Sequence, residues 1–418
     1  MMRQSPVFHA LVLAGALLAS AIAFQPAAHA QQRQLEHWTA TWGSSPAGPP
    51  QPSSTQTFAD QTLRLVVHAS IGGNRVRIRL SNEMGSTALR VGQADIAVRA
   101  SVASIVPGTD RPLTFGGAPS ITIPPGAAAL SDPVELNVAP LSDLAVSIYL
   151  PGTARATTTH DTTQSSYVST QGNFAGATTM PVALTIASWP FLTEVDLDSA
   201  GAAIVTLGDS ITNGARTTPD SNSRWPDWLA RRLQTVRDPI PGIDGRLSVV
   251  NRGISGNRLL SNAPEFDRDV LATAGVRYMT VLMGIEDIGS SPANAPVSQN
   301  ALIAGYRQLI ARAHEKGIAV YGATLPPFEG SALYSPAREQ VRQQINTWIR
   351  ATDEFDGVID FDQVLRDPAH GARLLPAYDS GDHLNPNDLG SRAMGNAVPL
   401  TLFGSIAVQA RTGSTTGK

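Results

Sequence analysis

The sequence predicts an α/β protein in which a β-sandwich or jelly-roll-like domain precedes a three-layer domain with a parallel sheet of five strands. Two stretches of different character lead to this fold class. Over residues 35–195, short apolar alternations are separated by Gly, Pro, Ser and Thr, a pattern typical of antiparallel strands joined by turns. Over residues 200–405, apolar runs alternate with amphipathic helical patterns, as they do in βα units that build a parallel sheet.

The first 30 residues have the pattern of a secretory signal peptide. Arg3 precedes an apolar stretch over Leu11–Phe24, and Ala28-His29-Ala30 fits a small-residue cleavage site. We therefore expect export, to the periplasm or as a secreted protein, with cleavage near Ala30. The sequence contains no Cys, so the exported fold has to rest on its core rather than on disulfides.

Composition limits the classes of partner. The formal net charge is −3 with only 16% charged residues, so neither a nucleic acid nor an anionic membrane is an expected partner. We see no second hydrophobic stretch that predicts a membrane span in the mature chain. The sequence has no H-E-x-x-H motif, no Cys cluster and no Gly-rich phosphate loop, so no metal and no cofactor are expected. The oligomeric state is left open.

The clearest strand of the β-rich domain lies at 75–80. There Val76, Ile78 and Leu80 alternate with three arginines, which is the period of a half-buried strand. A second alternation over 134–138 repeats this pattern. An apolar run over 144–150 predicts a further strand.

The elements of the α/β domain follow from the alternation of period. Strands are predicted at 202–207, 247–251, 278–283, 318–323 and 358–361. Helices are predicted at 225–234, 301–316, 337–351 and 391–402. The polar segment 406–418 is predicted to be a disordered tail.

The first of these strands ends abruptly in Gly208-Asp209-Ser210. Glycine permits a sharp turn, which would place Ser210 at the carboxyl end of a strand and near the start of a helix. Open α/β sheets bind ligands at that edge, and a helix N-terminus supplies backbone N–H groups for a developing oxyanion. The alternative is that Ser210 only caps the helix.

Four segments in order resemble the blocks of SGNH, or GDSL-type, hydrolases. They are Gly208–Thr212, Asn251–Asn257, Gly284–Asp287 and Asp382–Asn387. The resemblance covers about 202–403 and implies a flavodoxin-like domain that hydrolyses esters through an acyl-enzyme on Ser210. It also implies an oxyanion hole made by the backbone N–H groups of Ser210 and Gly256 with the side chain at position 286. There is no G-x-S-x-G motif, so the ordinary α/β-hydrolase elbow does not apply.

Two positions depart from the family pattern. Glu286 stands where the family has Asn, and an ionised carboxylate accepts hydrogen bonds without donating them, although a protonated Glu can still donate. Asn385 stands at the spacing of the catalytic His, and Asn cannot act as a general base. Asp382 is then predicted to orient the base, and His383 is the base by default.

Alternatives remain at this stage. His383 can instead hydrogen-bond only within its own loop. His160, in the β-rich domain, reaches the site only if that domain packs over it. The leading interpretation is an exported serine carboxylic-ester hydrolase, an esterase or acylhydrolase that cleaves a small-molecule, glycan or lipid ester. The alternative is a catalytically silent SGNH fold that binds a glycan or a lipid, because of Glu286 and Asn385.

Overall fold

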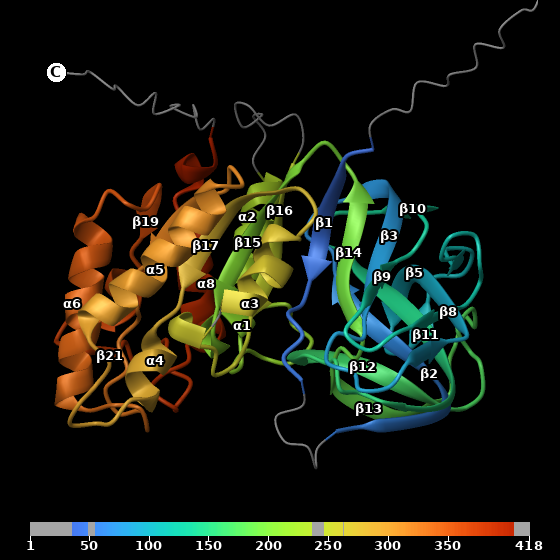
Figure 1. Ribbon diagram of the computed structural model, residues 1–418, viewed down its shortest axis with the longest axis horizontal. Coiled ribbons are helices and arrows are strands. Elements are labelled where there is room, and N and C mark those ends of the chain that lie inside the picture. Colours follow the sequence, from blue (N-terminus) through green and yellow to red (C-terminus); the bar gives the residue numbers. More distant parts are fainter. Residues whose placement is uncertain (1–35, 49–54, 236–245, 262, 405–418) are drawn as a thin grey trace, which may run out of the picture. The chain divides into compact units, whose positions relative to one another are not determined.

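An antiparallel β-sandwich and a parallel sheet flanked by helices make up the part of the chain that the structure describes (Figure 1). The computed structural model describes residues 36–48, 55–235, 246–261 and 263–404. The predicted signal peptide at 1–30 and the predicted tail at 406–418 lie outside these residues. No helix within the described ranges is long and apolar enough to cross a membrane.

Within the described residues, the β-sandwich consists of two antiparallel sheets and a separate strand pair. The first sheet has the order β1-β14-β3-β10, with β9 also paired to β3. Its strands are β1 (Trp38–Gly43), β3 (Gly73–Ser81), β9 (Ala128–Leu130), β10 (Val134–Val138) and β14 (Leu192–Asp198). The second sheet has the order β13-β12-β2-β11-β5-β6, with β7 also paired to β5. Its strands are β2 (Thr57–His68), β5 (Gln93–Ser101), β6 (Ser104–Ile105), β7 (Arg111–Leu113), β11 (Asp143–Arg155), β12 (Asp161–Gln171) and β13 (Val182–Ser188). The separate pair is β4 (Leu89–Val91) with β8 (Ile121–Ile123).

The predicted strand at 75–80 is confirmed as β3, and its two faces differ as expected. Val76, Ile78 and Leu80 are fully buried in the core between the sheets. On the other face, Arg77 forms an ion pair with Asp196 of β14, with 2.9 Å between Nε and Oδ2. The alternation therefore separates an apolar core face from a face of cross-strand ion pairs.

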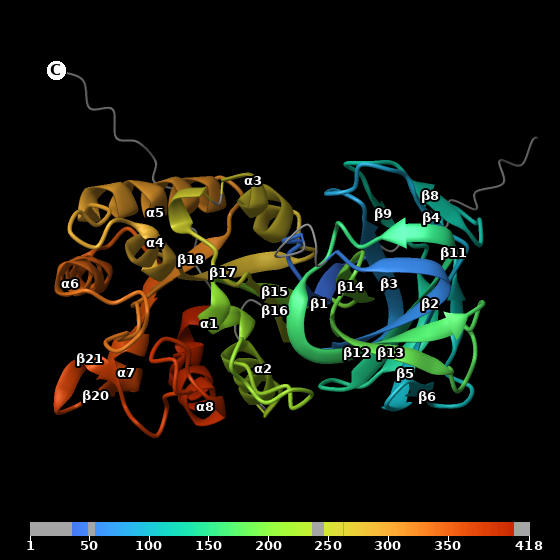
Figure 2. The same ribbon diagram turned by 90° about the horizontal axis from the view of Figure 1, so that it is seen from below.

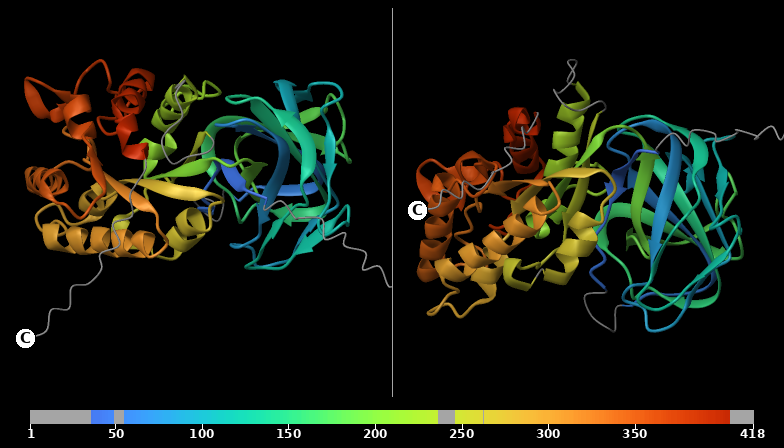
Figure 3. Two further views of the ribbon diagram at one scale, coloured as in Figure 1. Left: turned by 90° about the horizontal axis from the view of Figure 1, so that it is seen from above. Right: turned by 45° about the horizontal axis from the view of Figure 1, so that its top comes forward.

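The parallel sheet has the order β16-β15-β17-β18-β19, and it confirms the predicted α/β class with five parallel strands. Its strands are β15 (Ala202–Gly208), β16 (Leu247–Gly253), β17 (Val276–Leu282), β18 (Ala319–Ala323) and β19 (Gly357–Ile359). Helices α3 and α5 lie on one face, and α2 and α8 lie on the other (Figure 3). The helices are α1 (Ser210–Asn213), α2 (Trp225–Thr235), α3 (Ala263–Phe266), α4 (Ile285–Ser290), α5 (Gln299–His314), α6 (Pro336–Ala351), α7 (Phe361–Leu365) and α8 (Asp388–Ala397).

Several predicted boundaries were wrong, and capping residues explain two of the differences. The fifth strand ends at Ile359 because the Asp360 side chain accepts a hydrogen bond from the backbone of Gln363 and starts α7. The last helix begins at Asp388, earlier than predicted, because Asn387 caps it. The pattern analysis also missed the short helices α1 and α4 and the hairpin of β20 (Arg366–Asp367) and β21 (His370–Leu374).

The sandwich and the parallel sheet share buried contacts, and the described residues after Glu36 belong to one compact unit. Ala40 of β1 belongs to the hydrophobic core of the parallel sheet. Arg252 of β16 forms a buried ion pair with Glu194 of β14 and also donates to the Thr193 carbonyl at 3.1 Å. The architecture changes from antiparallel to parallel at about residues 195–200, where the division was predicted. The two parts nevertheless pack against each other.

Candidate active site

Ser210 lies just beyond the carboxyl end of β15, at the first position of the one-turn helix α1. Asp209 caps this turn, because its Oδ1 accepts a hydrogen bond from the backbone N–H of Ile211 at 2.9 Å. Gly214 ends it in the left-handed region with φ of 83°, and its N–H donates to the Ser210 carbonyl at 2.9 Å. The predicted position of Ser210 at this edge of the sheet is therefore what the structure shows.

The second predicted segment lies against this turn. A side chain at Gly253 of β16 would come within 2.3 Å of the Asn213 backbone nitrogen, so glycine is required for the close approach. The Asn251 side chain donates to the Thr212 carbonyl at 2.8 Å, and the Ile254 N–H donates to the Gly208 carbonyl at 3.0 Å. These contacts bring the loop that follows β16 to the side of α1.

Gly256 lies in this loop with φ of +78°, a conformation that favours glycine. A Cβ at Gly256 would have no heavy atom within 4 Å, so the demand for glycine comes from the backbone conformation and not from crowding. The preceding residue, Ser255, accepts a hydrogen bond from the Asn213 side chain at 3.3 Å. The role of the Gly256 N–H as an oxyanion donor stays a prediction.

The third segment forms the start of α4, directly after β17. Asp287 is buried and accepts hydrogen bonds from the backbone N–H groups of Leu259 and Leu260, at 2.7 and 3.0 Å. It thereby ties α4 to the loop that contains Gly256. Glu286 is half-buried, and burial raises the pKa of its carboxyl group while Arg258 opposes the rise. This keeps Glu286 protonated to higher pH than an exposed glutamate.

Asp209 completes a group of three carboxyl groups around the start of α1. Burial raises the pKa of Asp209 to about 8, and the charges of Glu286 and Asp287 add to the rise. In the described part of the chain, Oδ1 of Asp209 is hydrogen-bonded, whereas its Oδ2 is buried without a partner. Asp209 is therefore expected to carry a proton at neutral pH.

The fourth segment places Asn385 beside Asp382. Asn385 Nδ2 donates to Asp382 Oδ2 at 2.9 Å, and Arg216 Nε donates to the same oxygen at 2.8 Å. Burial alone would raise the pKa of Asp382, but hydrogen bonds from Asn385, Leu384 and Arg216 outweigh it and lower the pKa to about 2. Asn385 is only 7% exposed, and its Oδ1 is buried with no hydrogen-bond partner in the described residues. Asn385 thus makes the contact that an Asp-oriented histidine at this position would make.

The predicted pairing of Asp382 with His383 is wrong, because the partner of His383 is Asp379. His383 Nδ1 lies 2.5 Å from Asp379 Oδ2, and the His383 backbone N–H donates to the same carboxylate at 3.1 Å. His383 has φ of +60°, a left-handed conformation that is uncommon for a residue with a side chain. Its hydrogen bonds within the described residues go to Asp379, and none joins it to Ser210.

His160 comes to this site from the β-sandwich. Its Nε2 lies 3.0 Å from Oδ1 of Asn213, the last residue of α1. Figures 1 and 2 both show the start of β12 beside α1. The sequence predicts His160 at the site only if the β-rich domain packs over it, and it does not single out Asn213, because their contact joins residues far apart in the chain. The sole signal was the position of Asn213 one turn after Ser210.

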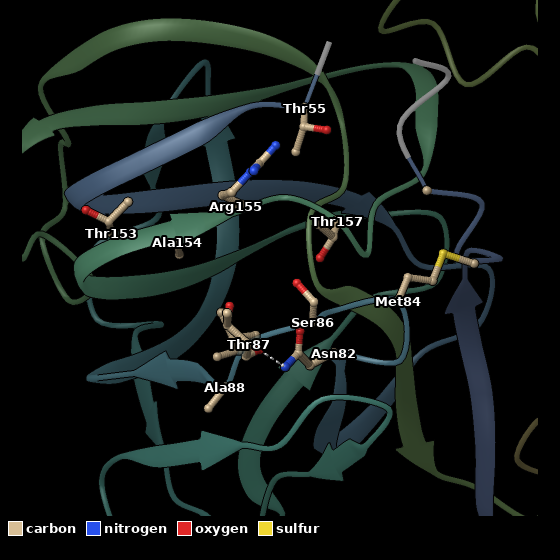
Figure 4. Close-up of a pocket in the computed structure, with 12 residues that line it drawn as sticks. Thr55, Asn82, Met84, Ser86, Thr87, Ala88, Thr153, Ala154, Arg155 and Thr157 are labelled. Carbon is tan, nitrogen blue, oxygen red and sulfur yellow. Dashed lines mark hydrogen bonds between the residues drawn. The ribbon is translucent and has the colours of Figure 1, made fainter. Parts of the chain in front are cut away.

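A pocket in the β-sandwich is lined by threonine, serine, alanine and glycine residues together with Asn82, Met84, Leu89 and Arg155 (Figure 4). It contains none of the predicted site residues. Within the described residues, no group of three or more His, Asp and Glu side chains is arranged to hold a metal ion.

Comparison with known proteins finds a family model that matches the region around Ser210. The model of the GDSL-like Lipase/Acylhydrolase family matches residues 206–393, which include all four segments. A lipolytic protein of the G-D-S-L family from Desulfitobacterium hafniense has a similar solved structure, with 21% identity, a TM-score of 0.37, and 47% of this chain and 97% of that chain covered. A catalytic mutant of the acetylxylan esterase Axe2 from Geobacillus stearothermophilus shows 21% identity, a TM-score of 0.37, and coverage of 49% and 95%. A GDSL-like lipase from Bacteroides thetaiotaomicron shows 18% identity, a TM-score of 0.35, and coverage of 48% and 87%. No curated protein matches the chain.

Proposed function

Because residues 206–393 form a GDSL-like lipase/acylhydrolase domain, we propose that the protein is a serine carboxylic-ester hydrolase that forms an acyl-enzyme on Ser210. The placement of Ser210 supports this proposal above all. It starts the helical turn that follows β15, with the Gly256 loop held beside that turn by Asn251 and Asn213. Backbone N–H groups at such a turn stabilise the negative charge that develops on the carbonyl oxygen during acyl transfer.

The base in this mechanism is His383, oriented by Asp379 rather than by Asp382. With Nδ1 bound to the Asp379 carboxylate, the neutral imidazole carries its lone pair on Nε2, the atom that would take the Ser210 proton. Asp379 would also stabilise the imidazolium that forms. The left-handed backbone of His383 supports a functional role, because such strain persists mainly where a site requires it.

Glu286 acts as a neutral hydrogen-bond donor to the oxyanion in this proposal. Burial raises its pKa, so the protonated form, which has an O–H to donate, persists to higher pH than in an exposed glutamate. The substrate is a small-molecule, glycan or lipid ester. Export of the enzyme rests on the signal-peptide pattern of residues 1–30.

Hydrolysis of short-chain p-nitrophenyl esters tests the proposal. Ser210→Ala and His383→Ala are each expected to lower kcat by about 10³-fold or more, since nucleophile and base act as a unit. His314→Ala is the matched control, because His314 is also exposed and also held by a carboxylate, with 2.7 Å between Nε2 and Asp356. The control should retain wild-type turnover. Equal losses in His383→Ala and His314→Ala would contradict the assignment of the base.

A catalytically silent fold that binds a glycan or lipid ester is the second candidate, and one observation favours it. Asn385 fills the position of the usual histidine and is hydrogen-bonded to Asp382, so the ordinary base is absent. If wild-type turnover equals that of Ser210→Ala while both proteins are folded, the binding function replaces the enzymatic one.

A further inference from the structure

Asn213 closes the helical turn that Ser210 opens. The Asn213 backbone N–H donates to the Asp209 carbonyl at 2.9 Å, and the next N–H, of Gly214, donates to the Ser210 carbonyl at 2.9 Å. Because α1 is a single turn, these bonds connect its two ends directly. A displacement of Asn213 is therefore transmitted to Ser210.

The Asn213 side chain joins three parts of the molecule. Its Oδ1 lies 3.0 Å from His160 Nε2, and its Nδ2 donates to the Asp161 carbonyl at 3.2 Å and to Ser255 Oγ at 3.3 Å. Ser255 immediately precedes Gly256 in the predicted oxyanion loop. One amide group thus connects the nucleophile turn, the oxyanion loop and the β-sandwich.

His160 is held firmly at the sandwich end of this chain of contacts. It is 4% exposed, and its ring stacks on Trp189 with 5.9 Å between centroids and 12° between planes. Its Nδ1 lies 2.7 Å from the Ser45 carbonyl, so Nδ1 carries a hydrogen. Both ring nitrogens are therefore used, one within the sandwich and one on Asn213. An imidazolium donates from Nε2 to the Asn213 Oδ1 and leaves the bonds of Nδ2 to Asp161 and Ser255 in place. A neutral imidazole accepts from Nδ2 once the Asn213 amide is turned over, which exchanges its bond to the Asp161 carbonyl for one to His160.

We propose that His160 is a positioning residue for Ser210, acting through Asn213, and that the β-sandwich thereby supports the reaction centre. This inference rests on the proposed role of Ser210 as the nucleophile. The imidazole does not touch the reacting atoms. It fixes the orientation of the Asn213 amide, which sets the spacing between the Ser210 turn and the Gly256 loop. Such spacing matters because a misplacement of about 1 Å can cost about 10²-fold in rate.

Two amide substitutions of His160 separate positioning from plain structural support. His160→Gln keeps an amide at the place of Nε2, which can donate to or accept from Asn213 while the bond to Ser45 is lost. His160→Asn keeps a donor at the place of Nδ1 and loses the bond to Asn213. We expect His160→Asn to lower kcat by about 10- to 100-fold with little change in KM. His160→Gln should remain within about threefold of wild type, since it keeps the contact with Asn213 through which His160 acts on the turn. His68→Asn serves as the control, because the hydrogen bonds of the His68 side chain in the described part of the chain go to Asp143 and Asn222 and not to a residue of α1.

Hydrogen exchange of the same variants gives a readout that does not depend on ester hydrolysis. His160→Asn should speed exchange in peptides that cover 209–214 and 254–257, whereas His160→Gln and His68→Asn should not. Equal kcat and equal exchange in the two His160 variants, whatever their melting temperatures, would overturn the proposal. If no protein hydrolyses esters but the exchange difference is present, the proposed function fails while the positioning of α1 by His160 stands.

Discussion

At the scale of single residues, the fourth segment holds two carboxylate-bound side chains that are two positions apart. Asp382 binds Asn385, and Asp379 binds His383. Only the second pair contains an imidazole, the side chain that serves most often as a general base. The first pair nevertheless keeps the carboxylate in place, so position 385 is already prepared to orient an imidazole.

Asn385→His should therefore restore activity to His383→Ala. The new imidazole would lie beside Asp382, whose Oδ2 now accepts a hydrogen bond from the Asn385 amide at 2.9 Å. We expect turnover of the double variant to exceed that of His383→Ala by about 10²-fold or more, measured with p-nitrophenyl acetate. His383→Ala combined with Asn385→Gln, which lacks a base, is the control and should stay inactive. No gain from the histidine would show that position 385 does not face Ser210.

Glu286 should make the wild-type rate depend on pH in a way that an amide does not. When Glu286 ionises, it loses its O–H and repels the oxyanion, so kcat should fall as pH rises through its raised pKa. This fall of kcat at high pH should be absent in Glu286→Gln and in Glu286→Asn, which introduces the residue that the family has at this position. Turnover of both variants at high pH should exceed that of wild type. The comparison is made on kcat–pH profiles, and a profile unchanged by both substitutions would remove Glu286 from the oxyanion site.

At the scale of elements, α1 is held by a buried cap. Asp209 accepts a hydrogen bond from Ile211 through Oδ1, while Oδ2 is buried without a partner. Asparagine can keep the Oδ1 contact and does not ionise. The cap therefore links the stability of the nucleophile turn to pH.

We predict that Asp209→Asn weakens the pH dependence of stability. An aspartate in the unfolded chain has a pKa of about 3.9, whereas burial raises the pKa of Asp209 to about 8 in the folded protein. Between these values the folded protein keeps a proton that the unfolded chain releases, so this group's contribution to stability falls as pH rises. Above about pH 8 the variant should thus gain stability relative to wild type, compared with pH 5. Urea unfolding at pH 5, 7 and 9 measures this, and a constant difference between the proteins would show that Asp209 is not buried as described.

At the scale of the whole molecule, the sandwich and the parallel sheet are joined by a buried ion pair. Glu194 of β14 and Arg252 of β16 are both almost fully buried, and Arg252 also donates to Thr273 Oγ1 at 3.0 Å. Removing one partner leaves an uncompensated buried charge. Because Glu194 belongs to the sandwich and Arg252 to the parallel sheet, loss of the ion pair should lower the stability of both parts together.

Arg252→Met is expected to destabilise the protein by about 3–5 kcal/mol. Arg307→Ala, which breaks the exposed pair with Glu354, should change the stability little and is the control. Both are measured by chemical denaturation followed by tryptophan fluorescence and circular dichroism.

We expect the unfolding transitions seen by fluorescence and by circular dichroism to coincide in wild type, because the sandwich and the parallel sheet share a core. Separate transitions would show that the predicted 35–195 and 200–405 domains unfold independently.

The sequence by itself determined the α/β class, the five parallel strands and the place of Ser210. These follow from local rules, since a buried apolar run and a glycine at its end impose a strand and a turn whatever packs around them. The spacing of the family's last segment likewise placed Asn385 at the position of the usual histidine. Short elements such as α1 escaped, because one turn carries no measurable period.

The tertiary structure alone decided which groups became partners. The choice of Asp379 over Asp382 for His383 depends on a left-handed residue that turns the side chain to the other carboxylate, and no pattern of residue types encodes that rotation. The contact of His160 with Asn213 spans 53 residues, and it exists only because the sandwich packs against the first turn of the α/β part. Burial, which raises the pKa values of Asp209 and Glu286, is a property of that packing. The protonation of the candidate site is therefore set by the folded assembly and not by the chain's local sequence.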